Sequence, residues 1–176
     1  MVKAGFGGGC HWCTEGVFQS LRGVAEVSQG FVTSAPPADT WSEGVIVTFD
    51  TSVISLATLS EVHLRTHSAT RFRSPRSKYR SAIYIFEDSQ RTEAELAITR
   101  FADESGKAVH TLVLPFASFT ASEDRYKNYY RTDPSRPFCR RYIDPKLAYI
   151  REHFSTLALP EATSSTSQAI NNNEGS

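Results

Sequence analysis

Two cysteines directly after three glycines form the segment of this sequence best suited to chemistry. Gly7, Gly8 and Gly9 precede Cys10-His11-Trp12-Cys13. Residues 2–7 are expected to form a short strand, the glycines permit a sharp turn, and a helix is expected over 14–21. This order places Cys10 at a helix N-terminus, where free N–H groups and the helix dipole stabilise an anion. We therefore expect a lowered thiol pKa and a reactive nucleophile at Cys10.

The same spacing is compatible with other roles. Cys10 and Cys13 could be inert thiols packed behind a turn, or a thioredoxin-like redox pair, which requires a βαβ context. They could also bind zinc, with His11 or Cys139 completing the ligand set, but zinc sites usually contain a second CxxC and this chain has none. A c-type haem requires His directly after the second Cys, where Thr14 stands. We expect no metal.

The elements that must position these residues alternate between strands and helices. Strands are expected over 24–32, 44–50, 81–86 and 111–114, and helices over 56–67, from 88 or 89 onward, and from Asp144-Pro145, where an N-cap acid precedes proline. Residues 68–79 lack apolar periodicity and are expected to form a loop, and 124–130 are expected to contain a helical turn. The order predicts an α+β domain, a mixed or antiparallel sheet with flanking helices.

Composition limits the partners and the compartment. The 176 residues suit one domain, assigned to 1–159, whereas the polar composition of 160–176 predicts a disordered tail. Lys plus Arg equals Asp plus Glu at 19 each, so charge gives no reason to expect a nucleic acid or a membrane as partner. Three cysteines, an odd number, argue against a disulfide framework. With no secretory signal evident, we expect a cytoplasmic protein.

Several motifs together resemble one enzyme family. The segment GGGCHWCTEGVF is similar to the GCFW signature of A-type peptide methionine sulfoxide reductases, and residues 79–84, YRSAIY, match a segment of that family almost letter for letter. Gly30-Phe31, the strand that follows Glu43, and residues 123–139 occur in the family's order. The resemblance covers about residues 3–155 of the chain.

The resemblance implies a ferredoxin-like α/β roll and a cycle of thiol chemistry. A thiolate attacks the sulfoxide sulfur, methionine leaves, a second cysteine converts the resulting sulfenic acid to a disulfide, and thioredoxin reduces that disulfide. No other cofactor is implied, the substrate is an oxidised protein or free methionine sulfoxide, and we expect a monomer. The matched residues are Cys10 as nucleophile, Glu43 as the acid that protonates the sulfoxide oxygen, Tyr79 as a hydrogen-bond donor to that oxygen, Trp12 as an aromatic wall, and Cys139 as the resolving cysteine, with Cys13 as the alternative.

Three departures from the family bear on the substrate. His11 replaces an apolar Phe and could still form part of the wall as a neutral imidazole. The loop between Phe31 and Glu43 is short, and Trp41 is its one candidate to contact substrate. Ser74 stands where the family has Asp. A same-fold oxidoreductase for another sulfoxide or a disulfide, and a non-catalytic redox or metal-binding module, therefore remain as alternatives. The basic cluster 71–80 is interpreted as a solvated loop.

Overall fold

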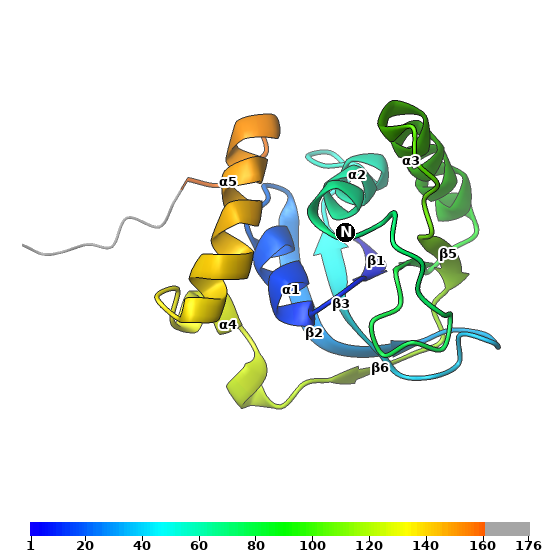
Figure 1. Cartoon of the computed structure of the whole chain (residues 1–176), viewed down its shortest axis with the longest axis horizontal. Helices are drawn as coiled ribbons and strands as arrows, with labels where there is room; N and C mark the ends of the chain where they lie inside the picture. Colours follow the sequence, from blue (N-terminus) through cyan, green and yellow to red (C-terminus); the bar gives the residue numbers. More distant parts are fainter. Residues whose placement is uncertain (161–176) are drawn as a thin grey trace, which may run out of the picture.

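A six-stranded sheet forms the centre of the molecule (Figure 1). The computed structural model describes residues 1–160, and the sheet has the order β5-β4-β1-β3-β2-β6. Its strands are β1 (Val2–Gly7), β2 (Val24–Thr33), β3 (Ser42–Phe49), β4 (Ala82–Ile85), β5 (Leu112–Pro115) and β6 (Ser118–Ala121). Strands β4 and β5 pair in parallel and the other neighbours are antiparallel. The predicted mixed α+β fold is confirmed.

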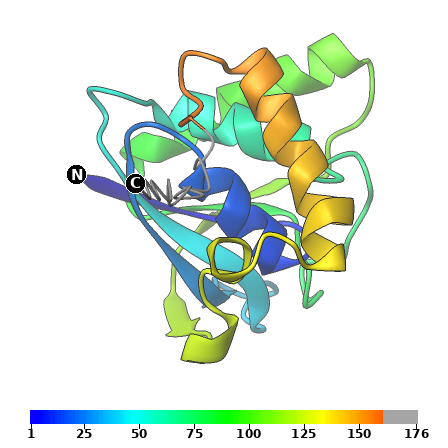
Figure 2. The same cartoon turned by 90° about the vertical axis from the view of Figure 1, so that its left-hand side faces the viewer.

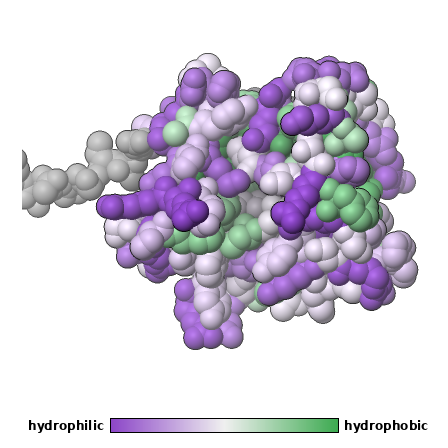
Figure 3. Space-filling view, viewed as in Figure 1, coloured by the Kyte–Doolittle hydropathy of each residue, from purple (hydrophilic) through white to green (hydrophobic). Residues whose placement is uncertain are grey.

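Helices lie side by side across the sheet, with α5 outside α1 (Figures 1 and 2). They are α1 (His11–Gln19), α2 (Leu56–Thr66), α3 (Ser89–Ser105), α4 (Tyr129–Thr132) and α5 (Asp144–His153), with a 3₁₀-helix at Asp124–Tyr126 and a π-helix at Cys139–Ile143. None of the helices in residues 1–160 is long and apolar enough to cross a bilayer. Hydrophilic residues cover most of the face drawn in Figure 3.

The main core lies between the sheet and helices α1, α2 and α5. Alternation along β3 sends Val45, Val47 and Phe49 into it, where they meet Phe18 of α1 and Leu59 of α2. All five side chains are almost completely buried. This packing stabilises the N-terminus of α1 against β1 and β3, because removing apolar side chains from water is the dominant favourable term in folding.

The structure differs from the sequence-based expectations at one helix boundary, one helix cap and one strand. Helix α1 begins at His11 rather than Thr14, because the chain turns within the glycines and the helix starts directly after Cys10. Helix α5 begins at Asp144 with Pro145 in its first turn, as expected, but Asp144 is not its N-cap, because the π-helix runs straight into α5; its carboxylate accepts from the Tyr130 hydroxyl at 2.6 Å instead. Strand β6 is an edge strand that the pattern did not reveal. Apart from Pro160, the predicted tail lies outside the described residues.

Candidate active site

Cys10 occupies the N-cap of α1, as the glycine turn predicts. Strand β1 ends at Gly7, and Gly9 has a φ of +91°, in the region that favours glycine. The turn delivers Cys10 to the first turn of the helix, and the Cys10 carbonyl accepts from the Thr14 backbone and hydroxyl, each at 3.4 Å. The thiol is partly exposed. It can therefore meet a substrate while its backbone is held by the helix.

The surroundings of Cys10 favour its thiolate. A hydrogen bond from the Cys13 thiol lowers the pKa of Cys10 most, and the backbone N–H groups of Trp12 and Cys13 act in the same direction, whereas burial and the Glu43 carboxylate oppose them. The pKa of Cys13 is raised, first by the hydrogen bond that it donates to Cys10 and then by burial. Burial also raises the pKa of Cys139. Of the three thiols, Cys10 is thus the one that these groups hold as a nucleophile.

Glu43 places a buried carboxyl group beside the start of α1. Its side chain points from β3, opposite Phe31 of β2, and is only 6% exposed. Oε1 lies 3.4 Å from the His11 backbone nitrogen and 3.2 Å from His11 Nε2, and Oε2 lies 3.7 Å from Lys78 Nζ. The first of these contacts brings the acid to the residue that directly follows Cys10.

His11 faces the protein and not solvent. Nδ1 lies 2.9 Å from the Gly30 carbonyl oxygen, and the Phe31 ring packs edge-on at a centroid distance of 5.5 Å. Both ring nitrogens therefore have partners, one on β2 and one on β3. The imidazole directs its polar edge at Glu43, and its role in a substrate wall stays a prediction.

Trp12 belongs to an aromatic cluster that sequence analysis found only in part. The indole stacks on Tyr129 of α4 with centroids 4.1 Å apart and planes 2° apart, and Phe138 meets it edge-on at 5.5 Å. Tyr126 lies at 6.2 Å. These rings provide an apolar surface beside Cys10 suited to the side chain of a thioether or sulfoxide.

Glu15 holds this aromatic cluster in place. The carboxylate is almost fully buried and accepts from the backbone N–H groups of Asn128 and Tyr129, both at 3.0 Å. These are donors at the start of α4, which has only four residues and cannot persist alone. Glu15 therefore fixes Tyr129 against Trp12. The motif Cys-Thr-Glu contained this residue, but its partner segment could not be read from the sequence.

Most of the chain matches a known family. The family model for peptide methionine sulfoxide reductase matches residues 2–158. A peptide methionine sulfoxide reductase MsrA of Sulfolobus acidocaldarius is 33% identical over 88% of this chain and 96% of its own length. The chain belongs to the peptide methionine sulfoxide reductase family. The resemblance drawn from the motifs, and with it the expected oxidoreductase class, is confirmed.

Solved structures agree on the fold. Reduced Mxr1 from Saccharomyces cerevisiae superimposes with a TM-score of 0.68 at 19% identity, covering 78% of this chain and 88% of Mxr1. Mxr1 in complex with Trx2 gives a TM-score of 0.58 at 17% identity, covering 71% of this chain and 83% of Mxr1. The predicted methionine sulfoxide reductase A fold is thereby confirmed.

Tyr79 and Trp41, the two other residues expected to contact substrate or its oxygen, are both partly exposed. Tyr79 is 37% exposed, and Lys78 Nζ, which reaches Glu43, lies 5.6 Å from the centre of its ring. Trp41 precedes β3 and is 48% exposed. None of the ring contacts recorded within residues 1–160 joins Trp41 to His11 or Trp12. Their roles in binding substrate stay predictions.

Cys139 is buried in the core. It begins the π-helix, is fully inaccessible, and belongs to the same core cluster as Cys13.

A cavity of about 280 Å³ lies between α1, α2 and α5, and Cys10, Cys13 and Lys146 are part of its wall. Within residues 1–160, no group of three or more His, Cys, Asp or Glu side chains is arranged to hold a metal ion.

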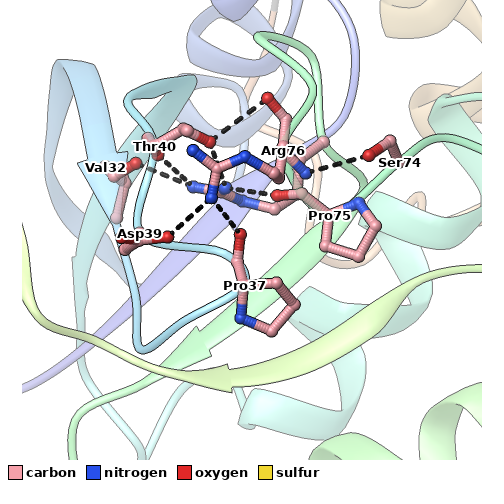
Figure 4. A network of polar contacts seen from close by, with 8 residues as sticks. Val32, Pro37, Asp39, Thr40, Ser74, Pro75 and Arg76 are labelled. Atoms are coloured by element: carbon pink, nitrogen blue, oxygen red, sulfur yellow. Dashed lines mark hydrogen bonds and ion pairs between the residues drawn. The ribbon is translucent and has the colours of Figure 1, made fainter.

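Arg80 connects the two loops that depart from the family pattern. Its guanidinium donates to the backbone carbonyls of Val32 at 2.9 Å, Thr40 at 2.9 Å and Pro75 at 2.6 Å. Figure 4 shows these partners gathered around one point, with Arg76 also reaching Asp39 and Pro37. Arg80 is fully buried, so interpreting the whole basic cluster as solvated is wrong for this residue.

Proposed function

We propose that this chain reduces the S-epimer of methionine sulfoxide, with Cys10 as nucleophile and Glu43 as proton donor. The observation that carries the proposal is the juxtaposition of a thiol whose pKa is lowered by its neighbours with a buried carboxyl group, whose Oε1 lies 3.4 Å from the backbone nitrogen of His11. A sulfoxide needs both groups, because its sulfur must be attacked while its oxygen is protonated.

The proposed cycle balances in atoms and electrons. The Cys10 thiolate attacks the sulfoxide sulfur to form a transient S–S bond, and the oxygen takes a proton from Glu43. The resulting hydroxyl group passes from the substrate sulfur to the Cys10 sulfur, so the substrate S–O bond and the transient S–S bond break as the new S–O bond forms. Methionine leaves with its sulfur reduced by two electrons, and Cys10 is oxidised to a sulfenic acid. A second thiol then attacks the Cys10 sulfur, water leaves, and a disulfide forms. A dithiol reductant reopens this disulfide by exchange and becomes oxidised.

The resolving step has two candidates in this chain. The family resemblance favours Cys139, which must leave its buried position to reach a partner outside the core. Cys13 already donates a hydrogen bond to Cys10, which supports it as the alternative. We propose thioredoxin as the reductant, supported by the complex of the structurally similar Mxr1 with Trx2.

The remaining parts of the proposal concern substrate and setting. Trp12 supplies the apolar wall, stacked on Tyr129, with Trp41 and Tyr79 at the rim. Oxidised proteins and free methionine sulfoxide are both substrates of the proposed chemistry. Three free thiols suit a reducing compartment such as the cytoplasm. We propose that the chain acts there as a monomer and repairs oxidised methionine.

The decisive assay uses resolved sulfoxide epimers. Thioredoxin, its reductase and NADPH are mixed with the chain and either the S- or the R-epimer, free or within a short peptide. We expect NADPH consumption with the S-epimer only. Equal consumption with both epimers, or with neither, would contradict the proposal. Consumption with a disulfide substrate that persists in Glu43→Gln would favour a thiol–disulfide oxidoreductase, because disulfide exchange requires no proton at a sulfoxide oxygen.

A further inference from the structure

The hydrogen bonds of His11 determine where its proton sits. Nδ1 faces the Gly30 carbonyl oxygen at 2.9 Å. A carbonyl oxygen only accepts, so Nδ1 carries a hydrogen in every protonation state that keeps this bond. A neutral His11 then has a bare lone pair on Nε2. This nitrogen is the one that lies 3.2 Å from Glu43 Oε1.

An unprotonated pair would be unfavourable. A bare Nε2 and a carboxylate oxygen both present lone pairs, and both side chains are about 8% exposed, so water screens their repulsion poorly. One proton between them removes the conflict. It can be carried on Nε2 as an imidazolium beside a carboxylate, or on Oε1 as a carboxylic acid beside a neutral imidazole, and the hydrogen bond exists in both forms.

We propose that His11 and Glu43 hold one proton in common, and that His11 keeps this proton available to the sulfoxide oxygen at neutral and mildly alkaline pH. Its use in catalysis rests on the proposed function, whereas the existence of the pair does not. His11 is a positioning residue, because it acts through Glu43. The thiolate step consumes one proton, which Glu43 delivers and which the pair regains from solvent after methionine leaves.

The charged groups around the pair define its pH response. Lys78 approaches Glu43 Oε2 to 3.7 Å from the loop before β4, Cys10 and Glu15 flank it on α1, and β2 contributes only the Gly30 carbonyl and the Phe31 ring. An ordinary glutamic acid loses its proton about two pH units below an ordinary imidazolium. Sharing the proton with an imidazole therefore extends its availability to higher pH.

Single-turnover kinetics test the catalytic part of the inference. Methionine release from the S-epimer, without reductant, is measured from pH 5.5 to 9 for the wild type, His11→Gln, His11→Phe and His153→Gln. Gln at position 11 can donate a hydrogen bond to Glu43 but cannot gain or release a proton in this pH range. His153 lies at the exposed end of α5 and provides the matched control.

We expect His11→Gln and His11→Phe to lose activity at lower pH than the wild type. Each protein's rate at pH 8 is divided by its own rate at pH 5.5. This ratio should be at least about tenfold lower in both His11 variants than in the wild type, because a displacement of one pH unit changes the rate tenfold. His153→Gln should follow the wild type. Superimposable profiles for His11→Gln and the wild type would overturn the inference and assign His11 a structural role.

Imidazole ¹⁵N spectra test the pair without any activity. Nδ1 of His11 should be protonated across the pH range measured, because its carbonyl partner only accepts, and the Nε2 signal should change in Glu43→Gln, because the group that shares its proton is gone. A bare Nδ1, or an Nε2 signal that Glu43→Gln leaves unchanged, would overturn the pair. If the wild type releases no methionine, the proposed function fails, and these spectra still decide whether the pair exists.

Discussion

Replacing Arg80 by Met should destabilise the fold far more than the same change at a neighbouring arginine. Arg80 is completely buried, and its removal leaves the carbonyls of Val32, Thr40 and Pro75 without this donor. An unsatisfied buried carbonyl costs about 1–3 kcal/mol. Removal of the buried charge offsets part of the summed cost of the three carbonyls, and relaxation of the loops offsets more. We therefore expect a net loss of about 2–4 kcal/mol in the free energy of unfolding.

Arg76→Met is the matched control. Arg76 connects the same two loops through Asp39 at 2.9 Å, but both side chains are about half exposed. Such surface pairs contribute about 0–1 kcal/mol. Guanidinium unfolding followed by tryptophan fluorescence gives both values. If Arg80→Met loses no more than Arg76→Met, the carbonyl hydrogen bonds of Arg80 do not stabilise these loops as argued.

Four further predictions concern the reacting groups. Glu43→Gln should fold normally and slow single-turnover methionine release by about 10²–10⁴, because an amide cannot donate a proton to the oxygen; a rate equal to wild type would remove Glu43 from the mechanism. Cys139→Ser should release one equivalent of methionine but lose thioredoxin-driven turnover, and full turnover in this variant would transfer the resolving role to Cys13. Because Cys13 lowers the pKa of Cys10, iodoacetamide should alkylate Cys10 with a pH midpoint below that of free cysteine, and Cys13→Ala should move this midpoint upward, as read by mass spectrometry. Because folding lowers the pKa of Cys10, its ionisation stabilises the folded state at pH values above the pKa of the unfolded thiol, and this contribution disappears as the pH falls through the pKa of the folded thiol. If the free energy of unfolding depended on pH identically in Cys10→Ala and the wild type across that window, this prediction would be contradicted.

Local pattern was sufficient for the position of Cys10 and for much of the sheet. The glycine turn before Cys10 and the alternation along β3 both depend on neighbouring residues, so Cys10 was predictable at a helix N-terminus and most of β3 was predictable as a strand, although it begins at Ser42 rather than Gly44 and so includes Glu43. The π-helix that buries Cys139 was not predictable, because its extra residue per turn has no sequence period of its own.

The polar partners within the site depend on contacts distant in sequence. His11 meets Glu43 only because β2 and β3 pair in the register that places Phe31 opposite Glu43. Glu15 meets the start of α4 across 113 residues of sequence. Arg80 meets Thr40 across 40 residues. A single sequence identifies such residues as charged but not their partners, and this is why His11 was expected only as part of an apolar wall.

The most direct test of the account is the stoichiometry of the first turnover. The reduced chain is mixed with excess S-epimer of methionine sulfoxide in the absence of any reductant, and released methionine is counted per chain. We expect about one equivalent from the wild type, as a cycle with a single nucleophilic thiol requires, and none from Cys10→Ser, although Cys13 and Cys139 remain present. Stoichiometric release by Cys10→Ser would contradict the assignment of Cys10 as the nucleophile.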